Sequence, residues 1–317
     1  MPADQPDQAI AGAGAAAAGG GVIHDIGYRR YRGERLGRAQ IGAALCWHSL
    51  RTAFGIGRGA RAKIVPAVTF GIMCLPAVVD AVIVARSPAG TRAVSYDTYV
   101  PALRILVMIV FLSAQAPELV SRDLRSRVLP LYFARPVRRL DYPAAKLAAL
   151  VLACLAMLGI PLLLLYLGTI AQAHGGGAVW AQTTALIPGL LVAALWSVLL
   201  APIALAISSL TARRAIAAGG VAIFFLLTWT LARLLVAIVS RTAAAGPGAG
   251  PPAAAQLYAL ISPFTVLDGV RQWLGGTTPG VIASPGRYGP AFGAAALAFL
   301  LTSLGLLTAR YRKAGLG

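Results

Sequence analysis

The chain has 317 residues, of which 58% are hydrophobic and 12% are charged, and its mean hydropathy is +0.75. Soluble domains carry about 45–50% apolar and about 25% charged residues, so this composition excludes a soluble globular protein. The net charge of +18 would suit a nucleic-acid binder, but basic cytoplasmic loops of a membrane protein explain it equally well.

The N-terminal residues 1–27 are predicted to form a disordered tail. Residues 1–21 are low-complexity Ala and Gly, and they lack the basic start and apolar core of a signal peptide. The cysteines form no CxxC pair, so neither a zinc site nor a disulfide framework is indicated. Buried free thiols are expected instead, at Cys46, Cys74 and Cys154.

Residues 34–55 are predicted to form an interfacial helix along the inner leaflet. Apolar residues recur at helical spacing on one face, with Trp47, Leu50 and Phe54 as the interfacial anchors. An amphipathic helix packed on a soluble core is the alternative. The position directly before a membrane span favours the interfacial interpretation.

Six apolar runs have the length of about 20 residues that a membrane helix needs. They predict spans over residues 64–85, 101–118, 144–170, 184–210, 215–240 and 290–309. The second is the weakest, because it contains Arg104 and ends on Pro117 and Glu118. An even number of spans places both termini on the same side of the membrane.

The distribution of basic residues predicts the orientation. Most lie in residues 1–63, in residues 119–146, at Arg213 and Arg214, and after the last span. The chain is expected in the plasma membrane, and this distribution of charge predicts that both termini are cytoplasmic. The opposite side holds only Arg86, Arg92, Arg241, Arg271 and Arg287. This asymmetry accounts for the positive charge without nucleic acid.

The long outer segment, residues 241–289, contains an apolar and aromatic stretch broken at Ser262–Pro263. Two short re-entrant helices over about residues 255–275 are one interpretation, and an extracellular loop with a packed turn is the other. The predicted fold is therefore an all-α polytopic membrane protein, with six spans, an interfacial helix and short re-entrant extracellular helices.

Motifs for chemistry are missing from the sequence. It contains no Walker A loop, no HExxH and no GxSxG, so no catalytic, cofactor-binding or metal-binding residue is predicted. Charged residues within spans usually pair or line a cavity. The charged residues within the predicted spans are Asp80, Arg104, Glu118 and Arg233. Snorkelling or a local ion pair explains these four residues better than a proton relay does.

The segment Glu118–Lys146 combines dense charge with an apolar knot over residues 128–133. Such amphipathic segments lie on a membrane surface or dock onto a partner. Its string LPLYFARPVRRLDYPAAK resembles the segment between the second and third spans of ABC-2 family permease subunits, particularly the six-span actinobacterial type. The resemblance in architecture extends over residues 28–317, which would form a single ABC-2 type transmembrane domain.

The resemblance implies a type V exporter-like half-transporter that is not itself an enzyme. Two separate ABC ATPase subunits, which bind the ATP and magnesium, would dock on residues 119–142, with Ser121–Arg127 as a coupling helix. A second permease subunit, identical or a sister, would complete the pathway in the lipid membrane, without nucleic acid. The docking residues would be Glu118, Arg122, Asp123, Arg125, Arg127, Leu129, Leu131, Tyr132, Arg135 and Arg139.

The cargo would be a small molecule, drug or lipid-like substrate. An ion-coupled secondary transporter without an ATPase partner is the alternative function. That class normally shows two related halves with broken spans at corresponding positions, and the sequence shows no repeat between its halves.

Overall fold

The computed structural model describes residues 37–86, 95–125, 138, 140–173, 175–243, 253–275 and 284–313. Residues from Gly37 onward cluster into one compact unit, and the predicted boundary between residues 27 and 28 lies outside the described residues. The described part of the chain is all-α. Its helices are α1 (Arg38–Ala53), α2 (Ala60–Arg86), α3 (Pro101–Arg125), α5 (Asp141–Ile170), α6 (Gly176–Ser209), α7 (Arg214–Ala243), α8 (Ala253–Ala259), α9 (Pro263–Trp273) and α10 (Gly289–Lys313), with a short 3-10 turn, η1 (Gly286–Tyr288).

Six helices are long and apolar enough to cross a membrane, namely α2, α3, α5, α6, α7 and α10. Each coincides with one of the six predicted spans, so the prediction of a six-span polytopic membrane protein is confirmed. Large apolar side chains on these helices face outward, as Leu75, Leu191 and Leu301 do. Soluble proteins rarely expose continuous apolar surfaces, whereas lipid accepts them.

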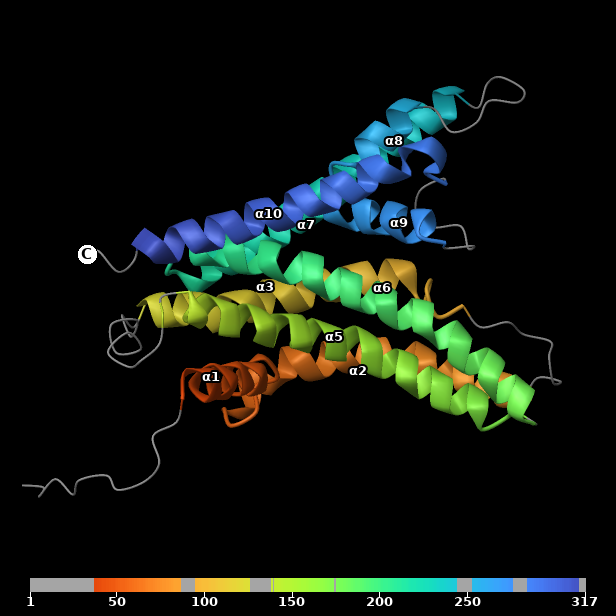
Figure 1. Cartoon of the computed structure of the whole chain (residues 1–317), viewed down its shortest axis with the longest axis horizontal. Coiled ribbons are helices and arrows are strands. Elements are labelled where there is room, and N and C mark those ends of the chain that lie inside the picture. The colour runs from red at the N-terminus through yellow and green to blue at the C-terminus, as the bar shows by residue number, and fades with distance from the viewer. Residues whose placement is uncertain are drawn as a thin grey trace, which may run out of the picture. The chain divides into compact units, whose positions relative to one another are not determined.

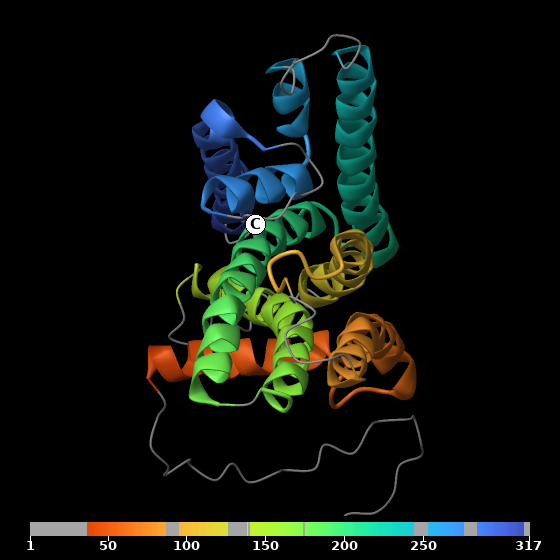
Figure 2. The ribbon, with the colours of Figure 1, turned by 90° about the vertical axis from the view of Figure 1, so that its right-hand side faces the viewer.

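The spans form a core and two flanks. Figure 2 shows α3, α5 and α6 between the pair α7 and α10 on one side and the pair α1 and α2 on the other. In α3 and α6, 72% and 67% of the apolar window is buried, against 17% in α2, α7 and α10. The central helices therefore pack against protein on most sides, and the three flanking spans present most of their surface outward.

Helix α1 lies across the spans. In Figure 1 the spans run horizontally and α1 is foreshortened, while in Figure 2 it runs across the view beside α5. The small residues Ser49 and Ala53 are buried, and Trp47 on the same helix is 62% exposed. This direction is the one that an interfacial helix takes, because its axis lies in the membrane plane.

Helix α3 is longer than predicted. Pro117 and Glu118 were expected to end the span, but the helix continues through Arg125. Residues Ser121–Arg125, which are the described part of the expected coupling helix Ser121–Arg127, are therefore the last part of α3. Helix interiors in membrane proteins tolerate proline where neighbouring groups compensate, and the charge of Glu118 is neutralised by two arginines, as described below.

Helices α8 and α9 form a pair bent by 120°, and the break lies at the predicted position. The Ser262 hydroxyl accepts a hydrogen bond from the backbone N–H of Phe264 at 3.3 Å, and Pro263 occupies the first turn of α9. Serine before a helix and proline in its first turn are both favourable start signals. These two residues explain why the chain turns sharply here instead of continuing as one helix.

Candidate functional site

Glu118, near the end of α3, is a buried carboxylate shared by two arginines. Its side chain is 2% exposed, with Oε1 at 2.5 Å from Arg58 Nη2 and Oε2 at 3.0 Å from Arg214 Nη1. Arg58 precedes α2 and Arg214 begins α7. Because each carboxylate oxygen takes a charged partner, Glu118 joins three elements that are distant in the sequence.

Asp123 ties the end of α3 to the start of α5. Its Oδ2 accepts a hydrogen bond from the Tyr142 hydroxyl at 2.7 Å and lies 2.9 Å from Lys146 Nζ. The Lys146 side chain is almost fully buried and its ammonium lies 5.5 Å from the centre of the Tyr142 ring. A buried ammonium is stable only when it is paired, so Asp123 fixes this helix junction.

Asp141, the first residue of α5, holds α1. Arg38 Nε and Nη2 donate to its two carboxylate oxygens at 2.6 Å and 2.5 Å, and the backbone N–H of Arg138 donates to Oδ2 at 2.8 Å. The hydrogen bond with Asp141 raises the pKa of the Arg38 guanidinium. An exposed pair adds little stability, but its bidentate geometry fixes the orientation of α1 on α5.

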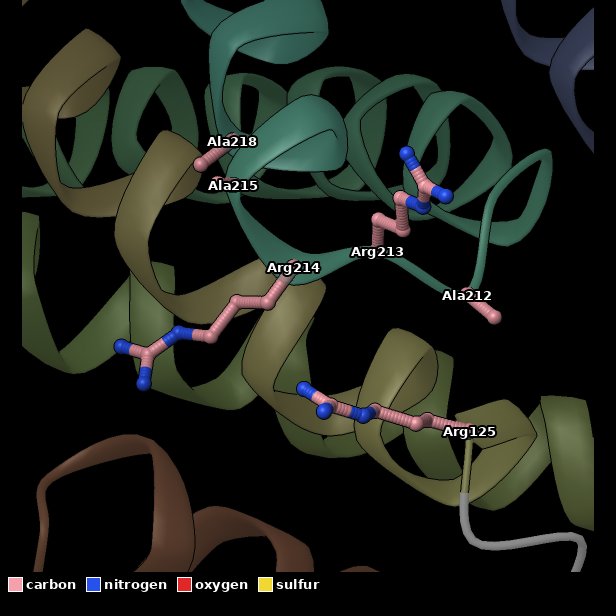
Figure 3. Close-up of a pocket in the computed structure, with 6 residues that line it drawn as sticks. All are labelled: Arg125, Ala212, Arg213, Arg214, Ala215 and Ala218. Atoms are coloured by element: carbon pink, nitrogen blue, oxygen red, sulfur yellow. The ribbon is translucent and has the colours of Figure 1, made fainter.

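A hollow of about 640 Å³ lies beside the contact between Arg214 and Glu118. It is named the arginine hollow below. Figure 3 shows the Arg125 side chain running from the end of α3 toward the start of α7, while Arg214 extends in the same general direction and Arg213 turns away to the other side. Three arginines and three alanines line the hollow. Its lining residues are Arg125, Ala212, Arg213, Arg214, Ala215 and Ala218.

A second hollow, of about 610 Å³, shares Arg214 with the first. Arg58, Arg61 and Glu118 are among its other lining residues. Arginines therefore line both hollows, and the Glu118 carboxylate already accepts two of them. The end of the unit formed by the start of α7 and the end of α3 is strongly positive.

The opposite ends of the spans carry a separate buried charge network. Arg271 of α9 lies 2.7 Å from Asp97 and 3.1 Å from Asp268. Arg104 donates to the Asp97 carbonyl at 3.4 Å, and its guanidinium carbon lies 4.3 Å from the centre of the Trp196 ring. Cation–π contacts of this kind stabilise a desolvated arginine. The network suits a clamp between α3, α6 and α9, in which the ion pairs are those of Arg271.

The predicted docking residues fall into two groups. Glu118, Asp123 and Arg125 lie together at the end of α3, and the first two have partners within the unit. The second group lies outside the described residues: Arg127, Leu129, Leu131, Tyr132, Arg135 and Arg139, together with the side chain of Arg122.

The predicted interfacial anchors of α1 differ in their exposure. Leu50 and Phe54 are half-buried against the core, and of the three anchors only Trp47 is largely exposed.

Sequence reasoning did not identify Arg58, Arg214 and Arg38 as the partners of these carboxylates. The basic loops were recognised as a topological signal, but which arginine meets which acid depends on how the helices pack. Within the described ranges, no group of three His, Cys, Asp or Glu residues could hold a metal ion. No model of a known protein family matches the chain, and no curated protein matches it.

Proposed function

We propose that the chain is the membrane-spanning subunit of an ABC-2 type transporter, driven by separate ATPase subunits that dock on residues 119–142. The cargo in this proposal is a small molecule, drug or lipid-like compound, and the direction is export. The support is the resemblance of the segment LPLYFARPVRRLDYPAAK to that family, together with six spans and a helix that lies across them.

The observation that carries the proposal is the anchoring of residues 124–140 on both sides. On the N-terminal side, Glu118 and Asp123 of α3 are bonded to Arg58, Arg214 and Lys146. On the C-terminal side, Asp141 of α5 is bonded to Arg38 of α1. A force applied to residues between these anchors would therefore reach α1, α3, α5 and α7 directly, since coupling travels through packed and bonded elements.

This arrangement suggests a division of roles in the proposed docking region. Glu118 and Asp123 position the helices, because their carboxylates are used within the unit. The contact with the ATPase is assigned to the arginines and apolar residues of the segment, among them Arg135 and Arg139. Closure of two ATP-bound subunits would then move the segment and rock the spans between inward-open and outward-open states.

The test is purification of the tagged chain in mild detergent from its source cells, with identification of any co-purifying protein that carries a Walker A sequence. The wild-type chain should retain such an ATPase. The double variant Arg135→Glu and Arg139→Glu should lose it, because the arginines are expected to contact acidic groups of the ATPase, which glutamates would repel. Membrane insertion should be unchanged.

The matched control reverses two arginines at the other ends of the spans, Arg241→Glu and Arg287→Glu. This variant carries the same change in net charge and should keep the ATPase. A wild-type chain that brings down no Walker A protein, or a segment variant with unchanged ATPase yield, would refute the proposal.

A further inference from the structure

We propose that the arginine hollow binds the phosphate headgroup of an anionic membrane phospholipid. The inference does not rest on the proposed transport function. It rests on three features of the hollow: two arginines that form no ion pair with a described carboxylate, a position at the ends of three spans, and an apolar lining that continues onto a lipid-facing helix.

The first feature is uncompensated positive charge. Arg125 and Arg213 are exposed, and no described carboxylate forms an ion pair with either of them. Arg214 gives one bond to Glu118, yet its side chain is 60% exposed. Guanidinium groups bind phosphate oxygens in a planar, often bidentate geometry. The arginines that line the hollow therefore favour a phosphate over a neutral ligand.

The second feature is depth. The apolar part of α3 ends at Ser121, one turn before Arg125, and the spans of α6 and α7 end and begin at Ser209 and Arg214. The hollow therefore lies just outside the hydrocarbon region, at the level of the headgroups. Basic pockets between spans at this level are the recognised setting for anionic headgroups.

The third feature is the apolar lining. Ala212, Ala215 and Ala218 line the same hollow, and Ile216 on the first turn of α7 is 56% exposed. Only 17% of the apolar window of α7 is buried, so its outer face is free to meet acyl chains. An acidic segment of a protein would use the arginines but would gain little from alanines that lead toward the hydrocarbon. A phospholipid uses both.

The experiment places the full chain in nanodiscs of phosphatidylcholine with or without phosphatidylglycerol, and counts retained lipids by native mass spectrometry. The wild type should retain phosphatidylglycerol in preference to phosphatidylcholine. The double variant Arg125→Gln and Arg213→Gln should weaken this preference about thirty-fold, because each basic residue near the surface contributes about 1 kcal/mol. Arg214 is left unchanged because it also holds Glu118.

The control is Arg241→Gln with Arg287→Gln, which removes two arginines at the opposite ends of the spans and should leave the preference within about two-fold of wild type. A double variant in the hollow that retains as much phosphatidylglycerol as wild type would overturn the inference, as would an equal loss in the control. Each variant is first checked for an unchanged melting profile.

A second arm adds inorganic phosphate to chains in pure phosphatidylcholine. The quantity compared is the melting temperature of the wild type. If inorganic phosphate raises it as much as phosphatidylglycerol does, and phosphatidylglycerol gives no further rise, the ligand is a soluble anion and the headgroup assignment is wrong. If the hollow variant keeps its phosphatidylglycerol but loses a protein partner, the hollow is a protein interface and the inference is likewise overturned.

Discussion

Glu118 illustrates how a carboxylate can be buried at the end of a membrane span. Removing one ion from water costs several kcal/mol, so a single buried acid is stable only with close charged partners. Arg58 and Arg214 supply them at 2.5 Å and 3.0 Å, and both arginines keep contact with water, because their side chains are 27% and 60% exposed. The two positive charges therefore stabilise the buried negative charge of Glu118.

Replacement of this acid, Glu118→Gln, should lower the stability of the chain by about 2 kcal/mol, since a hydrogen bond to a charged group contributes about 1.5–3 kcal/mol. Glutamine keeps the side-chain volume, so the loss of stability measures the contribution of the negative charge. The measurement is the thermal midpoint in mild detergent. In a double-mutant cycle with Arg58→Gln, the combined loss should be smaller than the sum of the two single losses.

Arg51→Gln serves as the control at the residue scale, because Arg51 is an exposed residue of α1. It should leave the midpoint nearly unchanged, within about 0.5 kcal/mol. Strict additivity between Glu118→Gln and Arg58→Gln would show that the pair is not an energetic unit.

At the scale of the helices, the six spans could be predicted from sequence because each apolar run is long enough to cross the bilayer by itself. The turn between α8 and α9 could also be predicted from sequence, because Ser262 and Pro263 are helix start signals. The end of α3 was not, because its continuation past Pro117 depends on partners of Glu118 that lie before α2 and at the start of α7. Likewise, the clamp of Asp97 and Arg271 requires knowledge of how α9 packs.

Glycine allows α9 and α10 to approach closely. A Cβ atom added at Gly269 would collide with the ring of Phe292, and one at Gly289 would collide with the ring of Trp273. Phe292 is fully buried, and it packs with Val266 and Val270 of α9. The bent pair is therefore seated on α10 by close contact of rings with backbone, in addition to the ion pairs of Arg271.

The variant Gly269→Ala should lower the stability of the chain by about 1–3 kcal/mol, the usual cost of overpacking. The matched control is Gly305→Ala in α10, where an added Cβ meets nothing within 4 Å. The control should be neutral or slightly stabilising, because alanine is the better helix former. Thermal midpoints measured side by side test both, and a Gly269→Ala chain as stable as the control would contradict the packing argument.

At the scale of the whole molecule, the ion pairs place the end of α3 and the starts of α2, α5 and α7 at one end of the spans. The Arg310 side chain of α10 joins them, because its Nε donates to the Ser209 carbonyl at 3.2 Å. The flanking helices α2, α7 and α10 leave most of their apolar surface for lipid or, in the proposed transporter, for a second permease subunit.

This arrangement predicts the outcome of cysteine labelling in intact cells. In a background with Cys46, Cys74 and Cys154 replaced by alanine, the variants Arg135→Cys and Arg213→Cys should be protected from a membrane-impermeant maleimide until the cells are opened. Arg287→Cys should react in intact cells, because Arg287 lies at the other end of the spans and the distribution of positive charge predicts that this end faces outward. Opposite labelling of Arg135→Cys and Arg213→Cys would contradict the six-span arrangement. Labelling of both from outside would leave the arginine-rich segment beyond the reach of any cytoplasmic ATPase, and the proposed function would be wrong even though the fold was right.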